Sequence, residues 1–243
     1  MNDQTMSVKL SPTTAASFAQ NWSSKSGSSS QDLQQLFESE DQKMISFKFT
    51  GDLNELLNVP SPAEPPYTLQ FHLGINQDGN LLPFVSHGAK DEANSHWSNA
   101  YTLVHTPSVN ASGRYQAIIN SSKNLPALIE IPVQRAKRYV DDWVAHTDFS
   151  NLFSYSFGGS TEWFKHFKVE MDDYSSLNKF FNDNPNSELY VHFAVETETI
   201  APQRFKFRIV VDLQKPNPQT EDDLVLFERL NPCPPCCPGS QVC

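Results

Sequence analysis

An internal repeat limits the possible architectures of this 243-residue chain more than any other feature does. Residues 47–72 align without a gap on residues 167–192, at a shift of 120, with eight identities in 26 positions. The identical pairs are Phe47 and Phe167, Lys48 and Lys168, Asp52 and Asp172, Leu57 and Leu177, Asn58 and Asn178, Pro65 and Pro185, Leu69 and Leu189, and His72 and His192. The repeat predicts two related units in tandem.

Each copy is preceded by the apolar spacing of a short amphipathic helix. This spacing, i, i+3, i+4, i+7, occurs at Ala15, Phe18, Ala19 and Trp22 in the first copy. It occurs again at Ala136, Tyr139, Val140 and Trp143 in the second. Ser11 and Pro12 supply a capping hydroxyl and a first-turn proline, whereas Pro132 supplies only the proline. We therefore expect one such helix at the start of each unit.

The order of patterns within each copy predicts an α+β fold. Residues 67–75 alternate between apolar and polar side chains, as a strand does when one face is buried. We expect each unit to hold a short helix, a mainly antiparallel sheet and a second short helix. The predicted boundaries are 1–106 for the first unit, 107–128 for a junction, 129–215 for the second unit and 216–243 for a Pro/Cys-rich tail. Within the junction, residues 115–119 have strand-like character, and the pattern leaves open whether the units share one sheet.

Charge and composition exclude several classes of function. The chain has 18 Lys plus Arg and 28 Asp plus Glu, a formal net charge of −10, which repels nucleic acid and anionic membranes. No segment approaches the roughly 20 apolar residues that cross a bilayer, and the first residues do not form a signal peptide. We expect an acidic, soluble, cytoplasmic protein that binds neither nucleic acid nor membrane.

All four cysteines lie in the last eleven residues, at Cys233, Cys236, Cys237 and Cys243. Cys233 and Cys236 have the two-residue spacing with which two thiolates bind one tetrahedral zinc ion, and Cys237 or Cys243 can add a third. A catalytic dithiol is not expected, because Pro235 and Pro238 prevent the helix that lowers the first thiol's pKa. The simplest interpretation is a reduced, proline-stiffened segment that packs on the protein or engages a partner.

Among the seven histidines, His72 and His192 stand out because they are equivalent in the two copies. They are candidates for a paired polar site on two related sheets. The alternative, which we favour, is that strand alternation places each one opposite the apolar face, partly exposed or hydrogen-bonded by a neighbouring strand. No metalloprotease histidine pair and no glycine-rich phosphate loop occurs. The sequence therefore predicts no catalytic residue and no cofactor, with zinc as the one possible ligand.

Several of these features together resemble a loose group of uncharacterised bacterial proteins that end in a Cys-Pro-Pro-x-Cys tail. They are the first amphipathic helix, the expected strand at residues 69–75, the expected hairpin partner strand at residues 81–85, and the terminus that begins at Cys233. This chain departs from the group by carrying two copies and further cysteines at Cys237 and Cys243. The group has no established activity, so the resemblance implies no catalytic residue, but it implies a shared role for the tail.

Three functional hypotheses follow from the sequence. The first is a non-enzymatic interaction or structural protein, with a protein partner or with self-association. The second is a zinc-binding protein that uses the C-terminal cysteines. The third is a hydrolase with a cleft between the two units, using His72 or His192.

Overall fold

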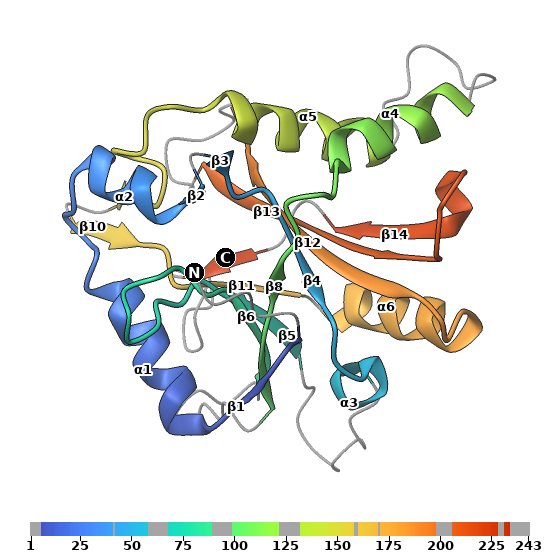
Figure 1. Cartoon of the computed structure of the whole chain (residues 1–243), viewed down its shortest axis with the longest axis horizontal. Coiled ribbons are helices and arrows are strands. Elements are labelled where there is room, and N and C mark those ends of the chain that lie inside the picture. The colour runs from blue at the N-terminus through green and yellow to red at the C-terminus, as the bar shows by residue number, and fades with distance from the viewer. Residues whose placement is uncertain are drawn as a thin grey trace.

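The computed structural model describes residues 6–40, 42–57, 68–88, 99–121, 132–157, 160–169, 171–197, 206–227 and 231–233 (Figure 1). The helices are α1 Pro12–Ser23, α2 Ser30–Leu36, α3 Leu53–Leu57, α4 Ala111–Ser121, α5 Pro132–Ala145 and α6 Met171–Asp183, with a 3-10 turn, η2, at Glu221–Asp223. The strands are β1 Lys9–Leu10, β2 Glu38–Ser39, β3 Gln42–Lys43, β4 Ser46–Phe49, β5 Thr68–His72, β6 Phe84–Gly88, β7 Ala100–Thr102, β8 Val104–His105, β9 Ser154–Phe157, β10 Ser160–Trp163, β11 His166–Lys168, β12 Glu188–Val195, β13 Phe207–Gln214, β14 Leu224–Phe227 and β15 Asn231–Cys233. The paired strands are antiparallel, and the predicted α+β class is confirmed.

Two large sheets contain strands from both halves of the chain. The first, called here the β5 sheet, has the order β1-β7-β6-β5-β11-β15, and the second, the β12 sheet, has the order β14-β13-β12-β4-β8. Strand β11 from the second predicted unit pairs with β5, and β4 from the first pairs with β12. The two predicted units thus exchange a strand. The tandem duplication stays a prediction. If it is correct, the two copies are not separate bodies, because each contributes a strand to the sheet of the other.

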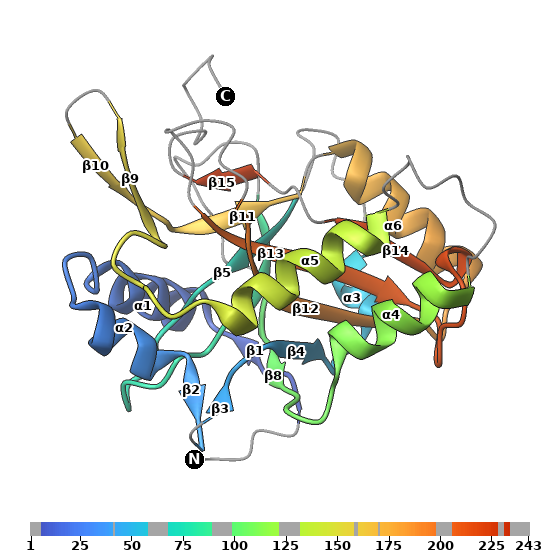
Figure 2. The ribbon, with the colours of Figure 1, turned by 90° about the horizontal axis from the view of Figure 1, so that it is seen from above.

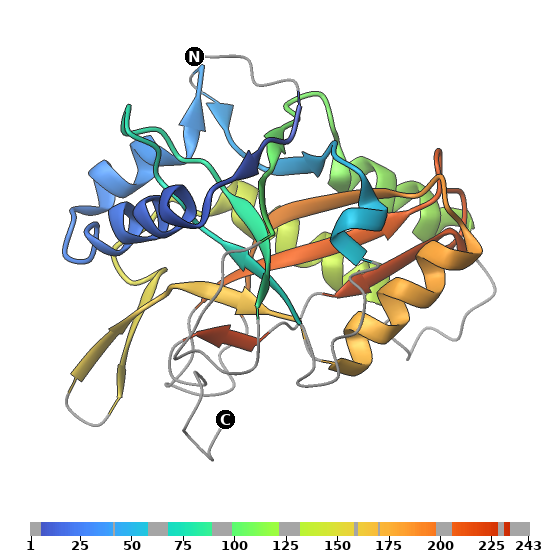
Figure 3. The same cartoon turned by 90° about the horizontal axis from the view of Figure 1, so that it is seen from below.

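The two sheets pack face to face, and helices cover their outer faces. Figure 1 shows α4 and α5 along one side of the molecule and α1 on the opposite side, and Figure 2 shows α4 and α5 running across the strands of the β12 sheet. Buried rings and aliphatic side chains fill the space between the sheets, among them Phe47, Phe71 and Phe193. Helix α6 contacts both sheets and adds Leu177 and Phe181 to this core (Figure 3).

Both predicted amphipathic helices are present, and each anchors itself through a buried tryptophan. Trp22 of α1 donates its indole N–H to the Phe164 carbonyl at 2.8 Å, and Trp143 of α5 donates to the Met44 carbonyl at 2.8 Å. The two accepting residues are 120 positions apart. The start signal of α1 is also confirmed, because the Ser11 hydroxyl accepts from the Thr14 backbone N–H at 3.1 Å.

Two sequence-based expectations differ from the structure. Residues 115–119 lie in helix α4, not in a strand, because Ala111, Tyr115 and Ile118 recur at helical spacing and pack against α5. The second concerns the boundary at 216, because the segment beyond it contributes strands to both sheets: β14 extends the β12 sheet and β15 extends the β5 sheet. Both strands satisfy backbone groups that an open sheet edge would leave unpaired.

No helix in the described ranges is long and apolar enough to cross a membrane.

Candidate functional site

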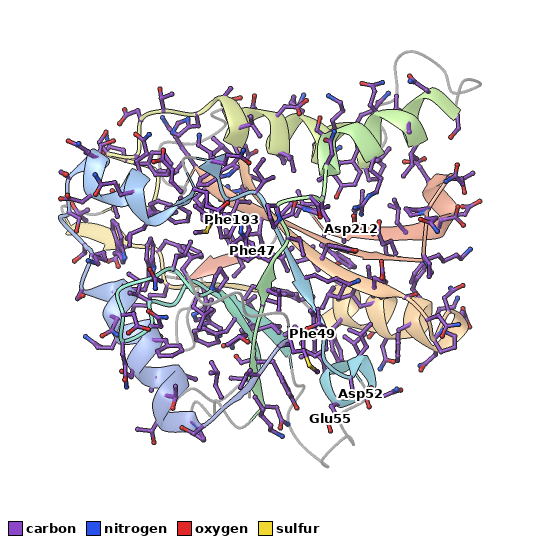
Figure 4. The ribbon with its side chains drawn as sticks, in the orientation of Figure 1. Phe47, Phe49, Asp52, Glu55, Phe193 and Asp212 are labelled. Atoms are coloured by element: carbon purple, nitrogen blue, oxygen red, sulfur yellow. The ribbon has the colours of Figure 1, made fainter. Side chains whose placement is uncertain are left out.

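The outer face of the β12 sheet carries a group of polar side chains beneath α4. Besides Arg208, the polar residues of β13 are Asp212 and Gln214, and they pair with Tyr190 and Glu188 of β12. Directly opposite residues share a face of the sheet, so all four lie on one face. The labelled Asp212 lies on the α4 side of the sheet in Figure 4, whereas Phe47 and Phe193 lie nearer the centre of the molecule. This polar face is the candidate functional site.

His192, one of the two histidines singled out by the sequence, belongs to a buried network on this face. Its Nδ1 lies 2.9 Å from Ser46 Oγ, and its Nε2 lies 3.5 Å from Asp212 Oδ2. The same carboxyl oxygen accepts a hydrogen bond of 3.0 Å from the Tyr115 hydroxyl. These four residues are at most 1% exposed. Of the two alternatives favoured for His192, partial exposure or a hydrogen bond from a neighbouring strand, the structure has the second, because Ser46 belongs to the adjacent strand β4 and α4 covers this face.

The order of hydroxyl, imidazole and carboxyl in this network resembles the catalytic groups of a serine hydrolase. Burial separates it from a working active site, since a substrate reaches Ser46 Oγ only if surrounding elements move. The contacts pair His192 Nδ1 with Ser46 and Asp212 Oδ2 with Tyr115, whereas His192 Nε2 and Asp212 Oδ1 have no hydrogen-bond partner among the described residues. We interpret Ser46, His192 and Asp212 as a network that holds α4 and the strands together.

A cavity of about 340 Å³ opens beside this network, beneath α4. Its lining residues are Arg114, Ala117, Ser121, Glu188, Tyr190, Gln214, Asn217, Pro218 and Gln219. Arg114 Nη1 and Gln214 Oε1 are buried and have no hydrogen-bond partner among the residues that the structure describes. A buried polar group without a partner costs about 1–3 kcal/mol. Both residues line the cavity, so one unpartnered donor and one unpartnered acceptor belong to its wall.

Arg114 and Glu188 line the cavity and carry opposite charges, and each has a neighbour of opposite charge outside the lining, Asp212 and Lys48 respectively. Lys48 Nζ lies 2.6 Å from Glu188 Oε1, and the Tyr190 hydroxyl donates to Glu188 Oε2 at 3.0 Å. Burial alone raises the pKa of Glu188, but the hydrogen bonds from Lys48 and Tyr190 outweigh it, so this pKa lies below its ordinary value. The Arg114 guanidinium lies 5.0 Å from the Tyr190 ring centroid, and its Nη1 is 3.9 Å from Asp212 Oδ2. Arg114 is thus held in place without a close ion pair.

His72, the second histidine singled out by the sequence, occupies a corresponding place in the β5 sheet. It is 3% exposed, its Nε2 lies 2.9 Å from Ser86 Oγ, and its ring stacks on Phe84. The His166 ring lies 5.0 Å away. Burial, and next the neighbouring His166, holds the pKa of His72 well below its ordinary value. His72 is thus buried as well, and it too has the second favoured arrangement, since Ser86 belongs to the adjacent strand β6.

His166 was not singled out by the sequence, yet its Nε2 is buried and has no hydrogen-bond partner within the described ranges. Burial, and next the charges of Lys165 and Lys168, lowers the pKa of His166 to about 4. The imidazole is therefore neutral at physiological pH, and a neutral imidazole is a form that binds metal ions.

The two histidine clusters stand at corresponding register positions of the two sheets. The corresponding residues are Ser46 and His166, His192 and His72, and Asp212 and Ser86. The structure does not bring His72 and His192 together in one site, since each belongs to a different sheet. The chemistry of the two clusters also differs, because one contains a carboxyl group and the other a second imidazole.

Of the predicted metal ligands, only Cys233 lies in the described ranges, where it pairs with His166 across β15 and β11. Cys236, Cys237 and Cys243 lie outside the described residues. Among the side chains that the structure describes, no group of three or more His, Cys, Asp or Glu is placed to hold a metal ion. The zinc site of the tail stays a prediction.

Comparison of the chain with family models, with curated proteins and with solved structures found no match.

Proposed function

We propose that this chain is a non-enzymatic binding protein whose cavity beneath α4 takes a small neutral molecule bearing a carboxamide or a similar group. The observation that carries the proposal is the buried, unpartnered pair of Arg114 Nη1 and Gln214 Oε1 at one cavity. A volume of about 340 Å³ is at the lower end of the range for small-molecule sites. The expectation of a protein partner or of self-association stays a prediction beside it.

The charges at the cavity favour a ligand without net charge. Glu188 and Asp212 offset Lys48 and Arg114, so the formal charges of these four side chains cancel. An anion attracted by Arg114 also meets the carboxylate of Glu188, which lines the same cavity. Burying a charge without a full set of partners is costly, so a neutral polar group is the better complement.

The unpartnered atoms also favour an amide over a carboxylate. A carboxamide offers a carbonyl oxygen to Arg114 Nη1 and an N–H to Gln214 Oε1. The matching carboxylate has no donor, so the acceptor on Gln214 remains unsatisfied. A site that hydrogen-bonds one group discriminates strongly against the analogue that lacks it.

Binding of paired probes tests this proposal. Saturation-transfer NMR with nicotinamide and propionamide, each compared with its carboxylate, is expected to show contact with the two amides alone. Arg114→Met is expected to remove the signal, because it deletes the donor and keeps an apolar side chain. Gln116→Met is the matched control, since Gln116 is on the exposed face of the same helix. Equal signals from amides and carboxylates, or an unchanged signal in Arg114→Met, contradict the proposal.

A hydrolase is the second candidate, and the contacts of Ser46, His192 and Asp212 favour it. Because Ser46 is 1% exposed, this candidate requires an opening motion. Treatment with a fluorophosphonate, followed by mass spectrometry, decides between the two. A covalent adduct on Ser46 supports the hydrolase, whereas an unmodified Ser46 supports the binding protein.

A further inference from the structure

A second cavity, of about 630 Å³, opens beside strand β8, where one segment of the chain passes from one sheet to the other. This segment supplies β7 to the β5 sheet and, after Leu103, β8 to the β12 sheet. The lining residues come from the segments 39–40, 42–47, 76–83 and 103–109. Figure 2 shows β2, β3, β4 and β8 on the same side of the molecule. A volume of this size is well within the range of ligand-binding sites.

Strand β8 lies at one edge of the β12 sheet, and its outer side presents unpaired backbone groups. The Thr106 N–H donates to the Ser46 carbonyl at 2.9 Å, in register with the ladder that pairs His105 with Phe47. Hydrogen-bonded and non-hydrogen-bonded pairs alternate along an antiparallel ladder, so the N–H and C=O of His105 point away from β4. Within the described residues, neither group forms a backbone hydrogen bond. An open strand edge of this kind accepts a further strand from another polypeptide.

The inner part of the cavity lining is apolar. It includes Met44, Phe47, Leu81, Leu103 and Val104, each of which is buried. A strand directs every second side chain to the same face. The cavity therefore suits an extended segment that has apolar residues at alternate positions.

The outer part of the lining, called here the rim, carries negative charge. Glu40 and Asp78 line the cavity and are exposed. Lys43 is the one lysine or arginine among the described lining residues. Its Nζ donates to the carbonyls of Trp143 at 2.9 Å and Val144 at 3.2 Å, at the C-terminal end of α5. These carbonyls form the negative end of the helix dipole and offset the charge of the lysine.

His105 adds no positive charge to the rim. Its ring centroid lies 5.4 Å from that of Phe47, and burial lowers its pKa, so the imidazole is neutral at physiological pH. The carboxylates at the rim thus favour a ligand that carries Lys or Arg. The formal net charge of −10 on the whole chain adds to this preference.

We propose that the cavity beside β8 binds an extended basic segment of a partner protein. The segment pairs with the backbone of His105, places alternate apolar side chains on the buried lining, and brings a Lys or Arg side chain to Glu40 and Asp78. In this mode of recognition, main-chain hydrogen bonds give affinity and the side-chain contacts give specificity. The site is independent of the ligand proposed for the cavity beneath α4, because the two cavities share no lining residue.

Titration of the isotope-labelled, full-length protein with capped peptides, followed by NMR, tests the site. The probe is a heptapeptide that alternates valine and lysine, and its matched control has glutamate in place of lysine. We expect the valine–lysine peptide to shift the amide signals of residues 103–106, and the valine–glutamate peptide to leave them unchanged. Equal shifts from both peptides, or no shift at these residues up to millimolar peptide, overturn the proposal.

Two double variants test the contribution of the rim. Glu40→Gln/Asp78→Asn is expected to weaken binding of the valine–lysine peptide about three- to tenfold, because it removes two exposed ion pairs. Asp183→Asn/Asp222→Asn is the matched control, since it changes the net charge equally and its two residues are exposed and line neither cavity. Equal affinities of the two variants contradict the assignment of the rim.

The strand pairing is tested on the wild-type chain, so the result does not depend on whether a variant folds. Methylation of the backbone nitrogens of the valine–lysine peptide removes the donors that pair with the His105 carbonyl. We expect the methylated peptide to bind about tenfold more weakly or worse. A methylated peptide that binds as tightly as the parent peptide contradicts pairing at the β8 edge.

Discussion

Tyr115 of α4 donates a hydrogen bond of 3.0 Å to Asp212 of β13, across 97 positions of the chain. Both residues are fully buried, and Asp212 also lies 3.5 Å from His192 Nε2. This bond places a helix from the middle of the chain over the polar face of the β12 sheet. The position of Arg114, one residue earlier on α4, depends on it.

Removal of the Tyr115 hydroxyl is expected to destabilise the protein. Tyr115→Phe leaves the buried Asp212 oxygen without this donor, so the free energy of unfolding is expected to fall by about 1–3 kcal/mol. Tyr101→Phe is the matched control, because its hydroxyl donates to Glu55, an exposed residue that water can satisfy. Urea unfolding of both variants measures the difference. Equal losses in the two variants contradict the assigned role of Tyr115.

The two tryptophan anchors are expected to contribute to stability in the same way. Trp22→Phe and Trp143→Phe each remove a 2.8 Å hydrogen bond to a backbone carbonyl and leave a cavity in the core. We expect each to lower the free energy of unfolding by about 2–4 kcal/mol. Trp163→Phe is the control, since Trp163 Nε1 has no hydrogen-bond partner in the described structure. Thermal and urea unfolding that show the largest loss for Trp163→Phe refute the anchor assignment.

The contribution of Glu188 to stability is expected to depend on pH. The pKa of Glu188 is lowered in the folded protein, so its contribution is complete above its ordinary pKa of 4.5 and is lost as the pH falls through the folded value. Glu188→Gln is therefore expected to be less stable than wild type at about pH 7, and the difference is expected to shrink towards about pH 3. Urea unfolding across this range measures it. A difference that stays constant over the whole range contradicts the assignment.

Much of the fold follows from local patterns in the sequence. The α+β class, the helices around Trp22 and Trp143, and the strand that carries His192 are each specified by spacing within a few residues. Pairing between strands is not specified in this way. The exchange of β4 and β11 between the sheets depends on contacts more than 90 positions apart, which alternation along one strand does not encode.

Most of the candidate site was not predictable either, because its residues come from segments that are far apart in the sequence. His192 was singled out by the repeat, but its partners Ser46 and Asp212 come from two other strands. Arg114 lies in a segment that was expected to be a polar junction, where nothing local indicates which sheet it covers. One signal was available, because Asp212 is a charged residue in the middle of an apolar run. Such a residue in a buried strand requires partners and thereby indicates a polar site.

Thermal unfolding of wild type and Gln214→Met, each with and without nicotinamide, decides whether the cavity beneath α4 binds a carboxamide. If Gln214 Oε1 is a buried acceptor without a partner in the ligand-free protein, Gln214→Met removes an unsatisfied group. The melting temperature of the ligand-free variant is then expected to equal that of wild type or to exceed it by up to about 4 °C. Nicotinamide is then expected to raise the melting temperature of wild type and not that of the variant. A variant that melts several degrees below wild type, or that responds to nicotinamide as wild type does, contradicts the account.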